Sequence, residues 1–115
     1  MRMRKRHNLE PRMEKCAGYI IKDSTAHCGR WMQDFPGYEK LYVELGCGKG
    51  RFTADTAASM PDTLFLAIEK VPDAMIIAME RIRDRELENV RFIDGDAAAL
   101  TEMFAPGEAD RIYIN

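Results

Sequence analysis

Apolar residues recur in short runs at regular intervals along the last two thirds of this chain. Four of these runs end at Gly, Pro, Asp or Asn or follow such residues, and each is too short for a buried helix. Such runs are typical of strands that are buried in a sheet. The pattern predicts strands over residues 41–45, 63–69, 89–94 and 109–115.

The segments between these runs have the spacing of helices. Residues 49–60 and 72–85 predict two helices, and residues 97–104 predict a shorter one. Pro72 suits the first turn of the second helix because its missing N–H would be unpaired there anyway. The side chains expected to face the sheet are Phe52, Ala54 or Thr56, and Ala57 in the first helix, and Ala74, Ile77 or Ala78, and Ile82 in the second.

The regular alternation of strands and helices predicts an α/β fold. Short connections between the elements favour a parallel sheet that is wound by right-handed crossovers, with helices on its faces. In such sheets ligands bind beyond the carboxyl ends of the strands. The residues that follow each predicted strand are therefore the first candidates for a binding site.

Residues 16–40 lack a sustained period and contain several Gly and Pro residues. This segment is expected to be a loop-rich lead-in with one short helix. Trp31 and Phe35 are expected to cover the sheet. His27 has no acidic partner at an informative spacing, so the sequence predicts a surface position for it.

Composition and charge divide the chain further. With 115 residues, 46% of them hydrophobic, the chain is long enough for one compact α/β domain. The net charge of −2 hides a basic start, since residues 1–15 hold six basic and two acidic groups. We therefore divide the chain into a basic arm with its lead-in, 1–40, and a sheet domain, 41–115. The arm could bind phosphates or could be a solvated tail; its cations include Arg2, Arg4, Lys5 and Arg6.

Cysteine spacing does not indicate disulfides or a metal site. Cys16, Cys28 and Cys47 are odd in number, form no C-x-x-C pair and have no histidine at a zinc-like spacing. We expect no bound metal and a reducing, cytoplasmic setting. The basic start is not followed by an apolar stretch of the kind found in secretory signals, and no segment has the apolar length of a membrane span.

The stretch VELGCGKGRF, residues 43–52, places three glycines directly after the first predicted strand. Gly46, Gly48 and Gly50 would let a ligand approach the backbone closely. A dinucleotide-binding turn would require a glycine at the position of Arg51, and Glu44 would repel a pyrophosphate. A nucleoside with a cationic tail, such as S-adenosylmethionine, would instead be attracted by Glu44.

Two further acids follow the next two predicted strands. Glu69 lies 21 residues after Gly48, where a carboxylate can accept hydrogen bonds from both hydroxyls of a ribose. Asp96 follows the third strand and could accept a hydrogen bond from the exocyclic amine of an adenine. Taken singly, each acid could be an ordinary capping residue. Their joint placement with the glycine turn favours a cofactor site formed by Glu44, Gly46, Gly48, Gly50, Glu69 and Asp96.

Several of these segments together resemble the bacterial tRNA (guanine-N7-)-methyltransferase family. The resemblance is carried by ELGCGKGRF at 44–52, FLAIEK at 65–70, NVRFIDGDA at 89–97 and DRIYIN at 110–115, and it extends to the basic start. It implies a Rossmann-like class I methyltransferase fold, S-adenosylmethionine as the methyl donor and N7 of a guanine in tRNA as the acceptor. By position, Glu44, Glu69 and Asp96 match the cofactor-binding acids of that family. The resemblance also favours tRNA contacts for the basic arm.

The family pattern continues beyond the last residue of this sequence. In the family, the fourth strand leads into an S-D-P-W-P-K segment that carries a further acid, whereas this sequence ends at Asn115. We therefore expect the N-terminal, cofactor-binding part of a longer enzyme, truncated after strand four, with the catalytic acid beyond Asn115 and no activity alone. In the usual strand order, 3-2-1-4-5, the fourth strand would have an open edge that favours self-association. A non-catalytic nucleoside-binding module is the alternative, and an NAD-dependent oxidoreductase is a weaker one.

Overall fold

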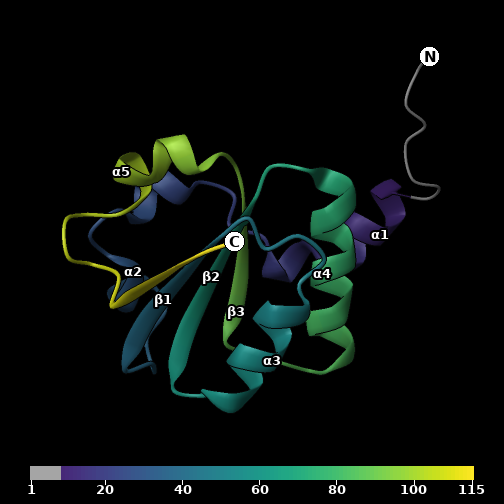
Figure 1. Ribbon diagram of the computed structural model, residues 1–115, viewed down its shortest axis with the longest axis horizontal. Helices are drawn as coiled ribbons and strands as arrows, with labels where there is room; N and C mark the ends of the chain where they lie inside the picture. Colours follow the sequence, from purple (N-terminus) through teal and green to yellow (C-terminus); the bar gives the residue numbers. More distant parts are fainter. Residues whose placement is uncertain (1–8) are drawn as a thin grey trace.

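A computed structural model describes residues 9–115 of the chain, and four parallel strands form its centre (Figure 1). The strands are β1 (Lys40–Leu45), β2 (Thr63–Glu69), β3 (Val90–Asp94) and β4 (Arg111–Ile114). Their order in the sheet is β3-β2-β1-β4. The predicted parallel α/β sheet and its strand order are confirmed, and each strand lies within two residues of its predicted bounds. Arg2, Arg4, Lys5 and Arg6 lie outside the described residues.

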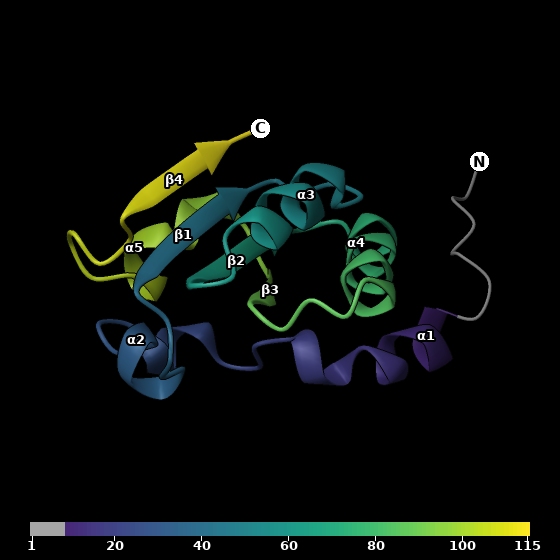
Figure 2. The same cartoon turned by 90° about the horizontal axis from the view of Figure 1, so that it is seen from below.

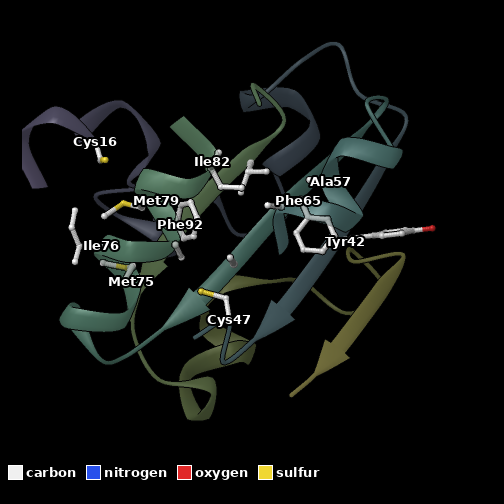
Figure 3. Close-up of a cluster of buried hydrophobic side chains, with 14 residues drawn as sticks. Cys16, Tyr42, Cys47, Ala57, Phe65, Met75, Ile76, Met79, Ile82 and Phe92 are labelled. Atoms are coloured by element: carbon white, nitrogen blue, oxygen red, sulfur yellow. The ribbon is translucent and has the colours of Figure 1, made fainter. Parts of the chain in front are cut away.

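Helices cover both faces of this sheet (Figure 2). One face packs against α3 (Arg51–Ser59) and α4 (Pro72–Asp84), in a core cluster drawn in Figure 3. The other face packs against α2 (Trp31–Asp34), the 3₁₀ turn η3 (Ala97–Ala99) and α5 (Leu100–Met103). All seven residues of β2 are buried because this strand lies between two others and is covered from both sides.

The first helix after the glycine turn faces the sheet with a different set of residues from the one predicted. Phe52 is 42% exposed, whereas Thr53, Ala54 and Ala57 are buried. The prediction for Phe52 is therefore wrong. Its ring instead lies 5.0 Å from the ring of Tyr113 on β4, edge to face. The helical pattern is compatible with either Phe52 or Thr53 facing the sheet. Hydrophobicity favours Phe52, because a polar residue such as Thr53 is buried only when it has a hydrogen-bond partner.

The apolar face of α4 is broader than the predicted one. Ala78 and Ile82 are buried as expected, while Ala74 and Ile77 are only half-buried. The remaining buried residues of this helix are Met75, Ile76 and Met79. The helix contacts β2, β3, α3 and α1 (Leu9–Lys15), so its buried residues cover more than one stripe.

The lead-in contains more structure than the sequence indicated. The helix α1 (Leu9–Lys15) precedes it, and the lead-in itself comprises the 3₁₀ turns η1 (Ala17–Tyr19) and η2 (Ser24–His27), and α2. Its middle lies along the outer edge of β3, where Ile20 forms a parallel bridge with Phe92 and the N–H of Ile21 donates to the carbonyl oxygen of Phe92 at 2.8 Å. The lead-in therefore closes one edge of the sheet. The division of the chain at residue 40 stays a prediction.

Trp31 anchors the lead-in on the second face of the sheet. Its side chain is fully buried, its indole Nε1 donates to the carbonyl oxygen of Met103 at 2.8 Å, and its ring stacks on Phe104 at 5.4 Å. His27 lies 4.8 Å from the Trp31 ring and its Nδ1 is 2.7 Å from Oδ2 of Asp34. His27 is half-buried and has an acidic partner, so the prediction of an unpartnered surface residue is wrong. His27 and Asp34 are seven positions apart, and this spacing alone did not indicate that the chain brings them together.

Candidate cofactor site

A cleft of about 250 Å³ lies at the carboxyl ends of the strands. Its walls come from the residues that end or follow all four strands, which brings together segments separated by up to 70 positions in the sequence. The lining residues are Leu45, Gly46, Ile68, Glu69, Lys70, Gly95, Asp96, Ala97, Ile114 and Asn115. This is the position at which parallel α/β sheets bind ligands. Three of the six predicted site residues, Gly46, Glu69 and Asp96, line the cleft.

The glycine turn folds back over the end of β2. The N–H groups of Gly46 and Cys47 both donate to the carbonyl oxygen of Ile68, at 2.8 and 3.2 Å. Gly46, Gly48 and Gly50 all have left-handed backbone conformations, which other residues adopt only under strain. A Cβ atom at Gly50 would lie 2.6 Å from Cβ of Ala78 on α4. Gly50 therefore allows α3 and α4 to approach closely, whereas a direct contact between Gly50 and a cofactor stays a prediction.

Glu69 connects the glycine turn to the start of α4. Its Oε1 accepts a hydrogen bond from the N–H of Gly48 at 2.7 Å, and its Oε2 accepts one from the N–H of Val71 at 3.1 Å. The residue is only 8% exposed and lines the cleft. A carboxylate has about four acceptor sites, so two sites remain for a ligand. Glu69 can therefore hold the turn in place and bind a diol at the same time.

Asp96 has both a capping role and a place in the cleft wall. Its Oδ1 accepts a hydrogen bond from the N–H of Ala98 at 3.0 Å and so caps η3. The preceding residue, Gly95, donates its N–H to the carbonyl oxygen of Glu69 at 3.2 Å. This bond places the β3 turn beside the end of β2, so Asp96 lies on the same side of the cleft as Glu69.

Glu44 lies behind the cleft and not in its wall. It is fully buried on the α3 side of β1, where it accepts hydrogen bonds from Oγ1 of Thr53 and from Nδ2 of Asn115. Burial raises the pKa of the Glu44 carboxyl, and the charge of Glu69 adds to this, while the two hydrogen bonds act in the opposite direction. The acid predicted for this position is present, but both of its carboxyl oxygens already have hydrogen-bond partners within the chain.

Acidic groups lie near the thiol of Cys47 in the glycine turn. Burial raises the pKa of the Cys47 thiol, and the nearby carboxylates of Glu44 and Glu69 raise it further. A group whose ionisation is opposed by two carboxylates marks a place where a cation is favoured and an anion is not. Lys70, on the cleft wall, is a basic residue among these acids.

Sequence reasoning missed three residues that complete the site. Thr53 was overlooked because a helical threonine carries no signal of burial, and Asn115 because it was the last residue of an apolar strand. Lys70 follows β2 directly, so the rule that selects strand ends could have found it.

Within residues 9–115 no group of three or more His, Cys, Asp and Glu side chains is arranged to hold a metal ion. No helix in this part of the chain is long and apolar enough to cross a membrane.

Comparison with known proteins identifies the family of this chain. A family model described as "Putative methyltransferase" matches residues 38–115. The chain is 31% identical over all 115 residues to a curated tRNA (guanine-N(7)-)-methyltransferase from Clostridium tetani, and 36% identical to one from Geobacillus thermodenitrificans. It covers 54% and 53% of those proteins, so it spans about half the length of the curated relatives it matches.

Solved structures support the fold independently. A structure described as an antibiotic-related methyltransferase superposes with a TM-score of 0.65 at 22% identity, over 82% of this chain and 47% of the other. At this identity the likeness shows the fold alone, and the predicted Rossmann-like class I methyltransferase fold is confirmed for the part present. From the match over residues 38–115 and the shared fold, we conclude that this chain belongs to the putative methyltransferase family.

Proposed function

We propose that this chain is the cofactor-binding portion of an S-adenosylmethionine-dependent tRNA (guanine-N7-)-methyltransferase. The observation that carries the proposal is the acidic cleft beside the glycine turn, in a chain that aligns over its full length with curated enzymes of that name. Class I methyltransferases in general use S-adenosylmethionine, and the acids of the cleft suit its cationic sulfonium and ammonium groups. A cytoplasmic location follows from this substrate.

In this proposal each wall of the cleft binds one part of the cofactor. Glu69 retains two acceptor sites for the ribose hydroxyls, and Asp96 retains a second carboxylate oxygen for the adenine amine. Gly46 and Gly48 leave the turn bare where the amino-acid end would lie. Gly50 acts through its packing on Ala78, and Glu44 through its hydrogen bonds with Thr53 and Asn115.

The bound cofactor would supply an electrophilic methyl group: a nitrogen lone pair would form the new N–C bond as the S–C bond breaks, and S-adenosylhomocysteine would leave with the electron pair of that bond. The N7 atom of guanine attacks with a lone pair that carries no proton, so the protein need not supply a base. Its main contribution is to hold the two reactants in line, which replaces a bimolecular encounter by an oriented one. The methylated guanine is cationic, so a carboxylate near it stabilises the developing charge. By the family resemblance, that acid lies in the segment that follows the fourth strand.

The basic arm is proposed to contact tRNA phosphates. Arg2, Arg4, Lys5 and Arg6 lie within five positions of one another in the sequence, and clusters of this kind bind nucleic acid with a strong dependence on salt. Replacing all four by glutamine should weaken tRNA binding and reduce its salt dependence. An unchanged salt dependence would contradict this assignment.

Calorimetric titration tests the cofactor assignment. The chain should bind S-adenosylhomocysteine and should show no binding of NAD, because the acids of the cleft disfavour a pyrophosphate. Glu69→Ala should reduce the affinity by roughly tenfold or more, since hydrogen bonds to a charged group are lost. Glu69→Gln is the matched control and should lose less, because one acceptor oxygen remains. Binding of NAD with no binding of S-adenosylhomocysteine would overturn the proposal.

A further inference from the structure

Asn115 connects the buried carboxylate of Glu44 to the cleft. It follows β4 directly, and its backbone N–H donates to the carbonyl oxygen of Leu45 at 3.2 Å. Its side-chain Nδ2 donates to Oε2 of Glu44 and, weakly, to the carbonyl oxygen of Gly46 at 3.5 Å. Asn115 also lines the cleft. One side chain therefore touches the buried acid, the glycine turn and the ligand space.

These contacts fix the orientation of the Asn115 amide. A backbone carbonyl accepts hydrogen bonds and cannot donate them, so the group that faces the carbonyl oxygen of Gly46 is the NH₂ group, which also donates to Oε2 of Glu44. The amide must therefore present its NH₂ group to Glu44 and Gly46, and its Oδ1 is directed away from both. In the part of the chain that the structure describes, no donor is bonded to Oδ1. Asn115 thus offers the cleft an acceptor whose direction is set by Glu44.

Glu44 itself is poorly placed to bind a ligand. It is fully buried, and Thr53 and Asn115 occupy one carboxylate oxygen each. Its charge can nevertheless act through the amide, because a hydrogen bond to a carboxylate polarises the donor group and makes the far oxygen a stronger acceptor. A cation in the cleft would also lie in the field of the buried charge without touching it.

We propose that Asn115 is a specificity-determining residue whose Oδ1 accepts a hydrogen bond from the protonated amine at the amino-acid end of the ligand. Glu44 is the positioning residue that orients and polarises Asn115, and Thr53 holds Glu44 in turn. This inference rests on the proposed function, since it assigns one contact within the same cleft. It predicts that the site distinguishes nucleosides with a charged amine from those without one.

The test compares three ligands that differ at this end. S-adenosylhomocysteine has the amine, its desamino analogue lacks only the amine, and 5′-methylthioadenosine lacks the whole amino-acid part. Calorimetry on the 115-residue chain should show that Asn115→Ala weakens binding of S-adenosylhomocysteine by about tenfold or more, as expected for a lost hydrogen bond to a charged group. The affinities for the desamino analogue and for 5′-methylthioadenosine should stay unchanged.

Measuring the wild type and Asn115→Ala with all three ligands separates this contact from a general effect on the cleft. Equal losses for all three ligands in Asn115→Ala, or no loss for S-adenosylhomocysteine, would overturn the proposal. If circular dichroism shows that Asn115→Ala is unfolded, Asn115→Ser gives the same comparison.

The wild-type chain alone provides a further check, because an undiminished affinity for the desamino analogue also overturns the proposal. If the wild-type chain binds none of the three ligands, the proposed cofactor site fails together with this inference. Binding of all three without discrimination overturns the inference alone.

Discussion

The two outer strands of the sheet are in opposite situations. At the β3 edge, the lead-in forms a bridge at Phe92 and the strand is mostly buried. At the β4 edge, Ile112 is 44% exposed and Ile114 is 80% exposed. Figure 2 shows the lead-in beyond β3 and β4 as the outermost strand on the other side. The cleft lies between these two halves, with Glu69 and Asp96 on the first side and Asn115 on the second.

The two sides of the sheet also differ in the contacts that hold the residues of the cleft. On the β3 side, backbone N–H groups bind the carboxylates of Glu69 and Asp96, and the lead-in covers the edge of β3 at Phe92. On the β4 side, the position of Asn115 depends on a buried acid, Glu44, and on one pair of strands. We therefore expect changes on the lead-in side to act on the stability of the fold, and changes on the β4 side to act on pH dependence and association.

The largest effect is expected where the lead-in is anchored. Trp31→Ala should lower the free energy of unfolding by about 3–5 kcal/mol, because it removes a fully buried aromatic side chain and leaves a cavity. Urea denaturation followed by circular dichroism measures this. Trp31→Phe is the matched control and should lose less, since it keeps the stacking on Phe104 but not the bond from Nε1 to Met103. A loss below 1 kcal/mol for Trp31→Ala would contradict the comparison.

Glu44→Gln should change the pH dependence of stability. The pKa of Glu44 is raised by burial above the ordinary value of 4.5, so the folded state keeps its proton to higher pH than the unfolded state does. Its contribution to stability is therefore greatest below pH 4.5 and is lost as the pH rises through the folded pKa. In urea denaturation at a series of pH values, the free energy of unfolding of the variant should increase relative to that of the wild type as the pH rises through the folded pKa. A constant difference between the two proteins would show that Glu44 does not titrate differently in the folded state.

Glu80→Gln should show the opposite sign and a smaller effect. The hydrogen bond from Arg12 lowers the pKa of the Glu80 carboxyl and ties α1 to α4. The contribution of this pair is therefore present above the ordinary pKa of 4.5 and is lost as the pH falls through the folded pKa. The same denaturation series should show the variant less stable at neutral pH and equal to the wild type in acid. Equal slopes for Glu80→Gln and Glu44→Gln would remove the distinction between the two groups.

The smallest effect on stability is expected at the exposed edge. We propose that two copies of this chain associate through β4, because an open strand edge with exposed apolar side chains pairs readily with another strand. Ile114→Lys should abolish concentration-dependent association in sedimentation velocity and change the free energy of unfolding by less than about 0.5 kcal/mol. Ile114→Val serves as the apolar control. A wild-type chain that sediments as a monomer at all concentrations would disprove the association.

The fold could be predicted from the sequence because its signals are local. The run at 64–68 is apolar throughout, and Pro72 and the three glycines mark the ends of their elements, so pattern alone located β2, α3 and α4. The cleft could be predicted in part, because residues that follow parallel strands meet at one edge whatever their side chains are. Phe52 and Thr53 show the limit, since hydrophobicity favoured the wrong one of two adjacent helical positions.

The sequence by itself determined the alternation of strands and helices, the glycine turn and the acids at three strand ends, because each depends on neighbouring residues. Only the tertiary structure decided what each acid does. Glu44 and Glu69 look alike in the sequence, yet one is buried between Thr53 and Asn115 and the other lines the cleft. The physical reason is that burial and hydrogen-bond partners are set by residues up to 71 positions away, which no local pattern encodes.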